Sequence, residues 1–239
     1  MSRTALARLK THFDACAERG TPRKVWWRDD DATRPGPKLE SLVRNARNAG
    51  ATVAVAAIPA DAEPRLLRYC EAEGLAVLQH GVAHKNHQTE GKSAELGNAQ
   101  PIATILDGLL AARDRLACDV FLPVLVPPWN RMRPDLGPAL LAAGYVGVSL
   151  FGTDTSDTDL KRVDTHIDPV AWRSDRSLLS DDRLTAMVEA AAGIDGPIGF
   201  LTHHKVHDEA IDDFIVAFAS LVADHPGAEW VEPKALFCP

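Results

Sequence analysis

The sequence predicts an α/β fold, a distorted parallel (β/α) barrel of about seven strands that forms a single domain over residues 1–239. Short apolar runs alternate with helical patterns along the chain, and such runs are typical of parallel strands buried on both faces. About seven strand–helix units favour a barrel over an open doubly wound sheet. No glycine-rich GxGxxG turn follows the first strand, which argues against a dinucleotide-binding fold.

The expected elements follow one another regularly along the chain. Strands are expected at residues 24–27, 51–59, 75–79, 120–126, 145–151, 197–203 and 228–231. Helices are expected in the amphipathic N-terminal pattern of residues 1–20 and at 38–49, 63–73, 101–117, 134–144, 181–193 and 208–223. The helix after the fourth strand has proline at its start and glycine at its end, which are the residues that these helix termini prefer.

The composition is that of a globular protein with a full core, with 46% hydrophobic and 25% charged residues. A formal net charge of −7 without a long basic run argues against nucleic acid and anionic membranes as partners. No apolar stretch approaches the roughly 20 residues of a membrane-spanning helix. The four cysteines are far apart and no signal-peptide pattern is present, so we expect reduced thiols and a cytoplasmic location. Nothing in the sequence sets an oligomeric state.

Polar side chains gather where four of the expected strands end. In chain order these clusters are Asp29, Asp30 and Asp31; His80, His84 and His87; Trp129, Asn130 and Arg131; and His203, His204 and His207. The loops at the carboxyl ends of the strands build the active site of a (β/α) barrel. We therefore expect these distant segments to meet.

A metal site is one interpretation of these clusters, and each also has a simpler one. Consecutive aspartates are more often a solvated turn or cap, and two histidines four residues apart often arise by chance. Here, however, the aspartates follow two tryptophans of a buried strand, where a nearby cation would relieve the repulsion between carboxylates. Two histidines and one carboxylate form a ligand set with open positions, as in catalytic sites. Which aspartate is the ligand and which a base stays open at this point.

Such a site predicts hydrolysis of an amide or an ester. A metal would polarise the substrate carbonyl and acidify water, a second aspartate would accept the proton, and a histidine would protonate the leaving group.

These residues resemble the motifs of the polysaccharide deacetylase family, carbohydrate esterase family four, and the resemblance covers residues 26–203. "RDDDA" is similar to the first motif, which implies Asp30 as the base and Asp31 as a metal ligand. "HGVAH" is similar to the second motif, which implies His80 and His84 as the other ligands.

The later motifs supply the rest of the implied active site. "VPPW" implies that Trp129 lines the site and that its backbone N–H helps to hold the oxyanion. "DPVAW" implies roles for Asp168 and Trp172 at the substrate, and "LTH" implies His203 as the general acid.

The chain also resembles a bacterial subgroup of this family with QHGxAHxNH and LVPPWNR motifs. This resemblance places Asn130 and Arg131 near the substrate. The residues implied to support the ligands are Asp29, Arg28, His87 and His204.

Three positions depart from the family's pattern. Gly81 replaces the usual serine or threonine of the second motif. Val126 and Ala171 stand where the family has an arginine and a second aspartate, which form a relay that tunes the base. Losing both is coherent, because one alone would be an unpaired buried charge. Candidates for the missing cation are Arg28, Arg131 and Arg173.

The resemblance implies a metal-dependent hydrolase of carbon–nitrogen (amide) bonds. Its expected substrate is a small saccharide or another amide that carries an N-acetyl or related acyl group. Zinc is the expected metal, with Fe, Co, Ni or Mn as alternatives. Two other classes stay open: a non-haem iron oxygenase with the same ligand set, and a degenerate member that binds saccharide or metal without turnover.

Overall fold

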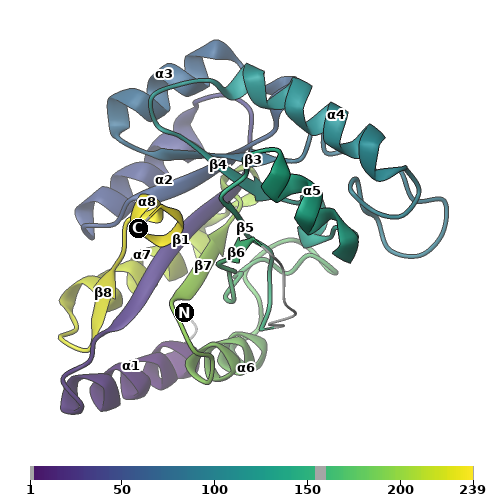
Figure 1. Ribbon diagram of the computed structural model, residues 1–239. Coiled ribbons are helices and arrows are strands. Elements are labelled where there is room, and N and C mark those ends of the chain that lie inside the picture. The colour runs from purple at the N-terminus through teal and green to yellow at the C-terminus, as the bar shows by residue number, and fades with distance from the viewer. Residues whose placement is uncertain (1–2, 154–159, 239) are drawn as a thin grey trace. The chain divides into compact units, whose positions relative to one another are not determined.

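The computed structural model describes residues 3–153 and 160–238, which form two compact units (Figure 1). Unit 1 is formed by the chain up to Asp29, by Gly36–Val53 and by Thr165–Pro233. Unit 2 is formed by Asp30–Pro35, by Ala54–Asp164 and by the residues from Lys234 onward. Strand β1 (Arg23–Ala32) contributes residues to both units. The single domain over residues 1–239 stays a prediction.

Unit 1 is built on the first seven residues of β1. These pair in parallel with β7 (Ile198–Thr202) on one side and with β8 (Ala228–Trp230) on the other. The helices of this unit are α1 (Arg3–Glu18), α2 (Pro37–Asn48), α6 (Asp181–Ala192) and α7 (Glu209–Asp224). Helices α1 and α6 lie side by side (Figure 1).

Aromatic side chains form the centre of unit 1. The ring of Phe200 on β7 stacks on Phe218 of α7, with 4.1 Å between ring centroids. Trp27 on β1 lies 5.2 Å from Phe200 and 5.8 Å from Trp230 on β8. Both tryptophans of β1, Trp26 and Trp27, are fully buried. This burial confirms that the aspartates which follow them come directly after core residues.

Unit 2 contains a parallel sheet in the order β2-β3-β4-β5-β6. The strands are β2 (Val53–Ala57), β3 (Ala76–His80), β4 (Phe121–Val126), β5 (Gly147–Val148) and β6 (Lys161–Arg162). The helices are α3 (Pro64–Glu73), α4 (Ile102–Arg113), α5 (Gly137–Ala142) and α8 (Pro233–Phe237). The 3₁₀ turns among the described residues of this unit are η1 (Pro59–Asp61), η2 (Asp114–Leu116), η3 (Pro128–Asn130) and η4 (Pro134–Leu136), and unit 1 contains η5 (His204–Val206).

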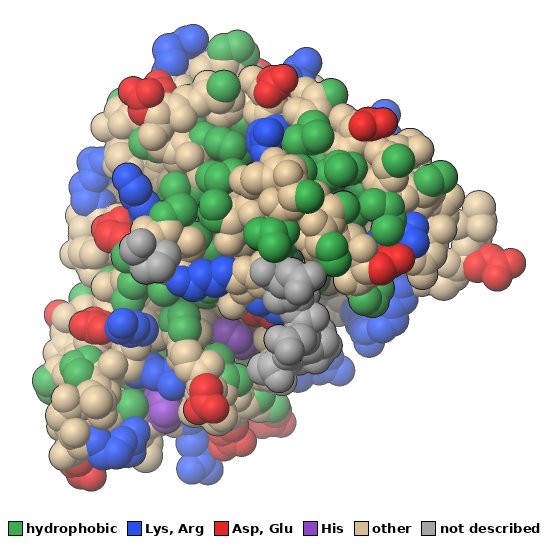
Figure 2. All heavy atoms as spheres, viewed as in Figure 1, with side chains coloured by type: hydrophobic (Ala, Val, Ile, Leu, Met, Phe, Trp, Pro, Cys, Tyr) green, Lys and Arg blue, Asp and Glu red, His purple; other side chains and the backbone are tan. Residues whose placement is uncertain are grey.

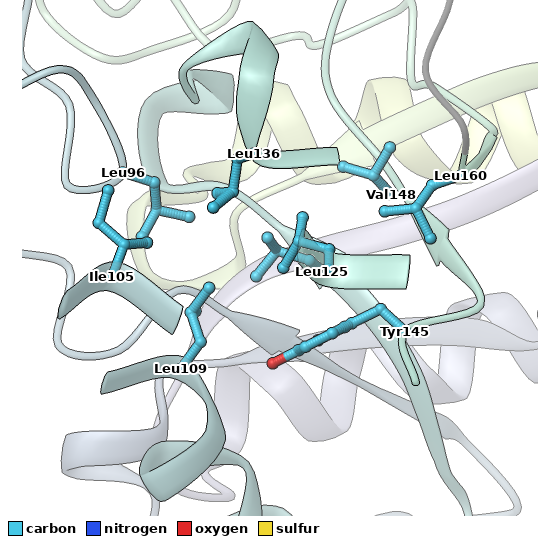
Figure 3. Packing of buried hydrophobic residues seen from close by; sticks show 9 residues of the cluster. Leu96, Ile105, Leu109, Leu125, Leu136, Tyr145, Val148 and Leu160 are labelled. Atoms are coloured by element: carbon cyan, nitrogen blue, oxygen red, sulfur yellow. The ribbon is translucent and has the colours of Figure 1, made fainter. Parts of the chain in front are cut away.

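The core of unit 2 gathers aliphatic side chains around Leu125 of β4 (Figure 3). A buried polar link crosses this core. The Tyr145 hydroxyl donates to Gln79 Oε1 at 2.7 Å, and Gln79 Nε2 donates to the carbonyl of Leu109 at 2.9 Å. Because the amide of Gln79 is paired at both ends, the glutamine ties β3 to α4 without an unpaired buried group.

The surface mixes side chains of different kinds. Acidic and basic side chains lie next to one another on the face drawn in Figure 2, with scattered hydrophobic side chains between them. None of the helices in the described ranges combines the length and the apolar character of a membrane span.

The predicted fold class, an α/β fold of about seven parallel strands joined by helices, is confirmed, and the described residues also contain the short strand β8 beside β1. Strand β1 is longer than predicted and ends at Ala32, so the three aspartates lie inside the strand and not after it. Strand β5 is shorter than the predicted range 145–151, and β6 lies outside the predicted strands.

Truncation of Leu109 tests the core of unit 2. Its side chain is fully buried, so Leu109→Ala is expected to lower the free energy of unfolding by about 2–5 kcal/mol through lost contacts and a residual cavity. The measurement is urea unfolding at neutral pH. The control is Leu141→Ala, at a side chain 49% exposed, with an expected loss within about 0.5 kcal/mol. Equal losses for the two variants would contradict this core assignment.

Candidate metal centre

Unit 2 brings the three predicted ligands together. Asp31 lies at the end of β1, His80 at the end of β3, and His84 in the loop that follows. One possible ligand atom from each residue lies within 4.8 Å of the other two. Asp31 Oδ1 is 3.1 Å from His80 Nε2 and 3.5 Å from His84 Nε2.

The contacts of His80 show which of its two ring nitrogens carries a proton. His80 Nδ1 lies 2.9 Å from the carbonyl of Val126, and because a carbonyl only accepts, Nδ1 carries the proton. In a neutral imidazole the other nitrogen is then an acceptor, and it faces the Asp31 carboxylate, which is also an acceptor. Burial alone would lower the pKa of His80, but the hydrogen bond to Asp31 and the charges of Asp30 and Asp31 raise it. The site therefore favours a cation at Nε2, either a proton or a metal ion.

His84 stands in a different environment. Burial and the charge of His80 lower the pKa of His84, so its imidazole stays neutral and able to bind a metal near neutral pH. Its ring packs against Trp129 of η3, with 4.3 Å between ring centroids. Trp129 thus contacts one member of the cluster, and its role at the substrate stays a prediction.

The backbone at this cluster adopts conformations that are rare for residues other than glycine. The structure has five such residues with positive φ in its described part, and four belong to this region: Asp31, His84, Trp129 and Asn130, with φ of 72°, 53°, 54° and 53°. Left-handed non-glycine residues persist only where their surroundings hold them, and they concentrate at functional sites. The strain is therefore a local property of the candidate centre.

Glu95 is a buried residue at this site that the sequence did not single out. Its carboxylate accepts hydrogen bonds from three backbone N–H groups of the segment that carries His84. Gly81 was the sequence signal for a group such as Glu95, because a glycine where the family has a side chain leaves room for another residue.

Other predicted residues of unit 2 shape the surroundings of the cluster. Arg131 Nη1 donates to the carbonyl of Ser93 at 2.9 Å, which ties η3 to the loop after β3. The backbone N–H of His87 donates to the carbonyl of Ala94, and His87 is outside the three-residue cluster. Asp30 is almost fully buried.

In unit 1, Asp29 is held by residues at the end of β7. Its Oδ1 accepts from the Thr202 hydroxyl at 2.8 Å and from the backbone N–H of His204 at 2.9 Å. Its Oδ2 accepts from His204 Nδ1 at 2.5 Å. Burial alone would raise the pKa of Asp29, but the charge and hydrogen bonds of His204 outweigh it and lower that pKa. Asp29 and His204 thus form a buried pair, next in sequence to the fully buried Arg28.

Asp168 joins His203 and Trp172 into a second group in unit 1. Trp172 Nε1 donates to Asp168 Oδ2 at 2.8 Å, and His203 Nδ1 lies 3.7 Å from the same oxygen. The Trp172 ring meets the His203 ring edge-on, at 4.6 Å between centroids. Trp172 is 42% exposed, so a carboxylate and an accessible indole flank the predicted general acid.

Neither a protein-family model nor a curated protein matches the sequence, but solved structures do. The Bc1960 peptidoglycan N-acetylglucosamine deacetylase matches with a TM-score of 0.60 and 14% identity, over 90% of this chain and 88% of that chain. The family 4 carbohydrate esterase from Streptomyces lividans, in complex with acetate, matches with a TM-score of 0.58 and 17% identity, over 90% and 95% of the two chains. The chain has the fold of carbohydrate esterase family 4 deacetylases.

A third neighbour shows that this fold does not guarantee activity. A mutant of a CE4 family pseudoenzyme with restored enzymatic activity matches with a TM-score of 0.60 and 14% identity, over 90% of this chain and 68% of that chain. Function must therefore be argued from the residues of the site.

Metal binding by the cluster is expected to stabilise the folded protein. Zinc added to chelator-treated protein at about 100 times its Kd should raise the free energy of unfolding by about 2.7 kcal/mol, because the ion binds the folded state. His84→Ala should abolish most of this gain. His12→Ala, at a partly exposed histidine of α1 outside the cluster, should keep it. The measurement is denaturant unfolding with and without zinc, and equal behaviour of the two variants would argue against this ligand set.

His207 of unit 1 is expected to make stability depend on pH. It is buried, and burial lowers its pKa from 6.5 to about 4. The unfolded chain takes up this proton near pH 6.5 and the folded protein only near pH 4, so stability is lost as the pH falls through that window, by up to about 3 kcal/mol. His207→Gln should flatten this part of the pH dependence, as measured by urea unfolding between pH 7 and pH 4. An unchanged slope would contradict the assignment.

Proposed function

We propose that the protein is a metal-dependent hydrolase that removes an acyl group, N-acetyl in the first place, from an amino-sugar-like or other small amide substrate. The observation that carries this proposal is the cluster of Asp31, His80 and His84, whose possible ligand atoms lie within 4.8 Å of one another. The fold supports it, since the neighbours named above include deacetylases.

Asp31, His80 and His84 would hold a divalent metal. Two imidazole nitrogens and one carboxylate oxygen suit zinc, and Fe, Co, Ni and Mn are alternatives. When bound, such an ion supplies Lewis acidity that polarises an acyl carbonyl and makes water a stronger acid. The protonated Nδ1 of His80 leaves its Nε2 lone pair directed at this position.

Asp30 is the proposed general base. The resemblance of "RDDDA" to the family's first motif supports this role, and Asp30 directly precedes Asp31, which faces the two histidines. It would take a proton from the water that attacks the acyl carbon. The backbone N–H of Trp129 would donate to the oxygen on which negative charge develops.

His203 is the proposed general acid. It would give a proton to the nitrogen of the departing amine as the carbon–nitrogen bond breaks, releasing the acid and the free amine. Asp168 would hold the ring of His203 in place, and the exposed face of Trp172 is suited to packing against a sugar. Asn130 and Arg131 are proposed to contact the substrate.

Two other functions are weighed against this one. A non-haem iron oxygenase would use the same ligand set, but such enzymes usually build it on a β-sandwich-like barrel, and the parallel α/β fold argues against it. A degenerate binding member gains some support from Val126 and Ala171, because both are buried and apolar where the family has its charged relay. We also propose a soluble saccharide in the cytoplasm as the substrate, with neither nucleic acid nor membrane as a partner.

Two substitutions test the proposed base and the proposed acid. Acetate release from N-acetylated oligosaccharides, with zinc restored, is the assay. Asp30→Asn and His203→Gln should each lower kcat by about 10²–10⁴-fold, because each removes one proton transfer. Zinc affinity should remain close to wild type in both variants. Asp61→Asn, at an exposed aspartate of the same unit as Asp30, is the control and should retain full activity.

An activated ester distinguishes the two roles. The p-nitrophenolate of p-nitrophenyl acetate leaves without a proton, so His203→Gln should retain most of the activity on this ester and Asp30→Asn should lose it. Wild-type protein that binds zinc and saccharide but releases no acetate across a broad panel would overturn the hydrolase in favour of the binding member. Oxygen consumption by the iron-loaded protein would favour the oxygenase.

A further inference from the structure

Glu95 places a buried carboxylate against the segment between the two histidine ligands. The residue is 2% exposed. Its Oε2 accepts from the backbone N–H of Val82 at 2.9 Å. Its Oε1 accepts from the N–H groups of Ala83 at 2.8 Å and Lys85 at 3.2 Å. One side chain thus pairs with three of the backbone donors of this short segment, two before His84 and one directly after it.

Gly81 and Glu95 are complementary in shape. Gly81 has φ of +59°, and a Cβ added to it would lie 2.1 Å from Glu95 Oε2 and 2.5 Å from Pro128 Cγ. Both distances are far inside van der Waals contact. The carboxylate therefore occupies the space that a side chain at position 81 would fill, which is where the resembling family carries a serine or threonine.

The three donors surround His84 along the chain. Ala83 and Lys85 precede and follow it, and His84 itself has φ of 53°, a conformation that its surroundings must hold in place. The residue before Glu95 is also hydrogen-bonded within this loop. The Asn86 side chain accepts from the N–H of Ala94 at 3.0 Å. The segment that carries His84 and the segment that carries Glu95 are thus joined by hydrogen bonds within one loop.

We propose that Glu95 is the positioning residue that sets the metal-binding conformation of His84, replacing the hydroxyl side chain expected at position 81. This inference rests on the proposed function, because the metal is the one held by Asp31, His80 and His84. Removing the carboxylate would release three backbone donors and let the left-handed turn at His84 relax, which would move one ligand away from the other two.

The test compares Glu95→Gln and Glu95→Ala with Glu90→Gln, a control at an exposed glutamate of the same loop. Zinc affinity is measured by competition with a chromophoric chelator. Amide hydrogen exchange of the segment from residue 81 to residue 85 is measured on metal-free protein, so that it reports on the loop without any metal. The glutamine is isosteric but has only one acceptor atom, so it should keep part of the support and produce the smaller effect.

The expected loss of zinc affinity is larger in Glu95→Ala than in Glu95→Gln. Zinc binding should weaken by about 10-fold in Glu95→Gln and about 100-fold in Glu95→Ala, with the control unchanged. Exchange in the segment should accelerate in the same order, because the local opening becomes easier. Wild-type affinity in both Glu95 variants, or unchanged exchange, would overturn the role of Glu95. Failure of the wild-type protein to bind zinc would instead overturn the proposed function, and the exchange data would then decide separately whether Glu95 holds the loop.

Discussion

The hydrogen bond from His80 Nδ1 to the carbonyl of Val126 controls the chemistry of the candidate metal centre. It is a consequence of sheet register, because His80 and Val126 are directly paired residues of the parallel strands β3 and β4. The register thereby fixes which nitrogen of the ring carries the proton and leaves Nε2 as an acceptor facing Asp31. Position 126 contributes its backbone carbonyl to this arrangement, so an apolar side chain there is compatible with the hydrogen bond to His80.

The backbone of β1 explains why the aspartates of the triplet face different neighbours. In a regular strand, Asp29 and Asp31 would point to the same face and Asp30 to the other. Asp31 has φ of 72°, so the regular alternation ends there. Asp29 keeps its place beside Thr202 and His204 in unit 1, while Asp31 turns toward His80 and His84 in unit 2. A backbone irregularity therefore places Asp31 beside the two histidines, where strand periodicity alone would point it elsewhere.

Much of the fold could be predicted, because long apolar runs such as those of β2, β3 and β7 leave little choice of element. The strands that differed are short or polar: β5 has two residues, and β6 consists of Lys161 and Arg162, which carry no hydrophobic signal. That the aspartate triplet would meet His80 and His84 was predictable from the positions of these residues near strand ends. The choice of Asp31 depended on the resemblance of "RDDDA" to the family's first motif. Glu95 was not predictable, because its role depends on the missing Cβ of Gly81 and on no periodic pattern.

Asp29, Glu95 and Asp31 differ in the polar groups that surround their carboxylates. Asp29 is surrounded by a hydroxyl, an amide and an imidazole N–H, and Glu95 by three amides. Donors of this kind satisfy the negative charge by themselves, so both acids are suited to holding structure. The neighbours of Asp31 include two imidazole nitrogens, which are themselves able to bind a cation. Of these three acids, Asp31 is therefore the one whose surroundings gain most from a metal ion.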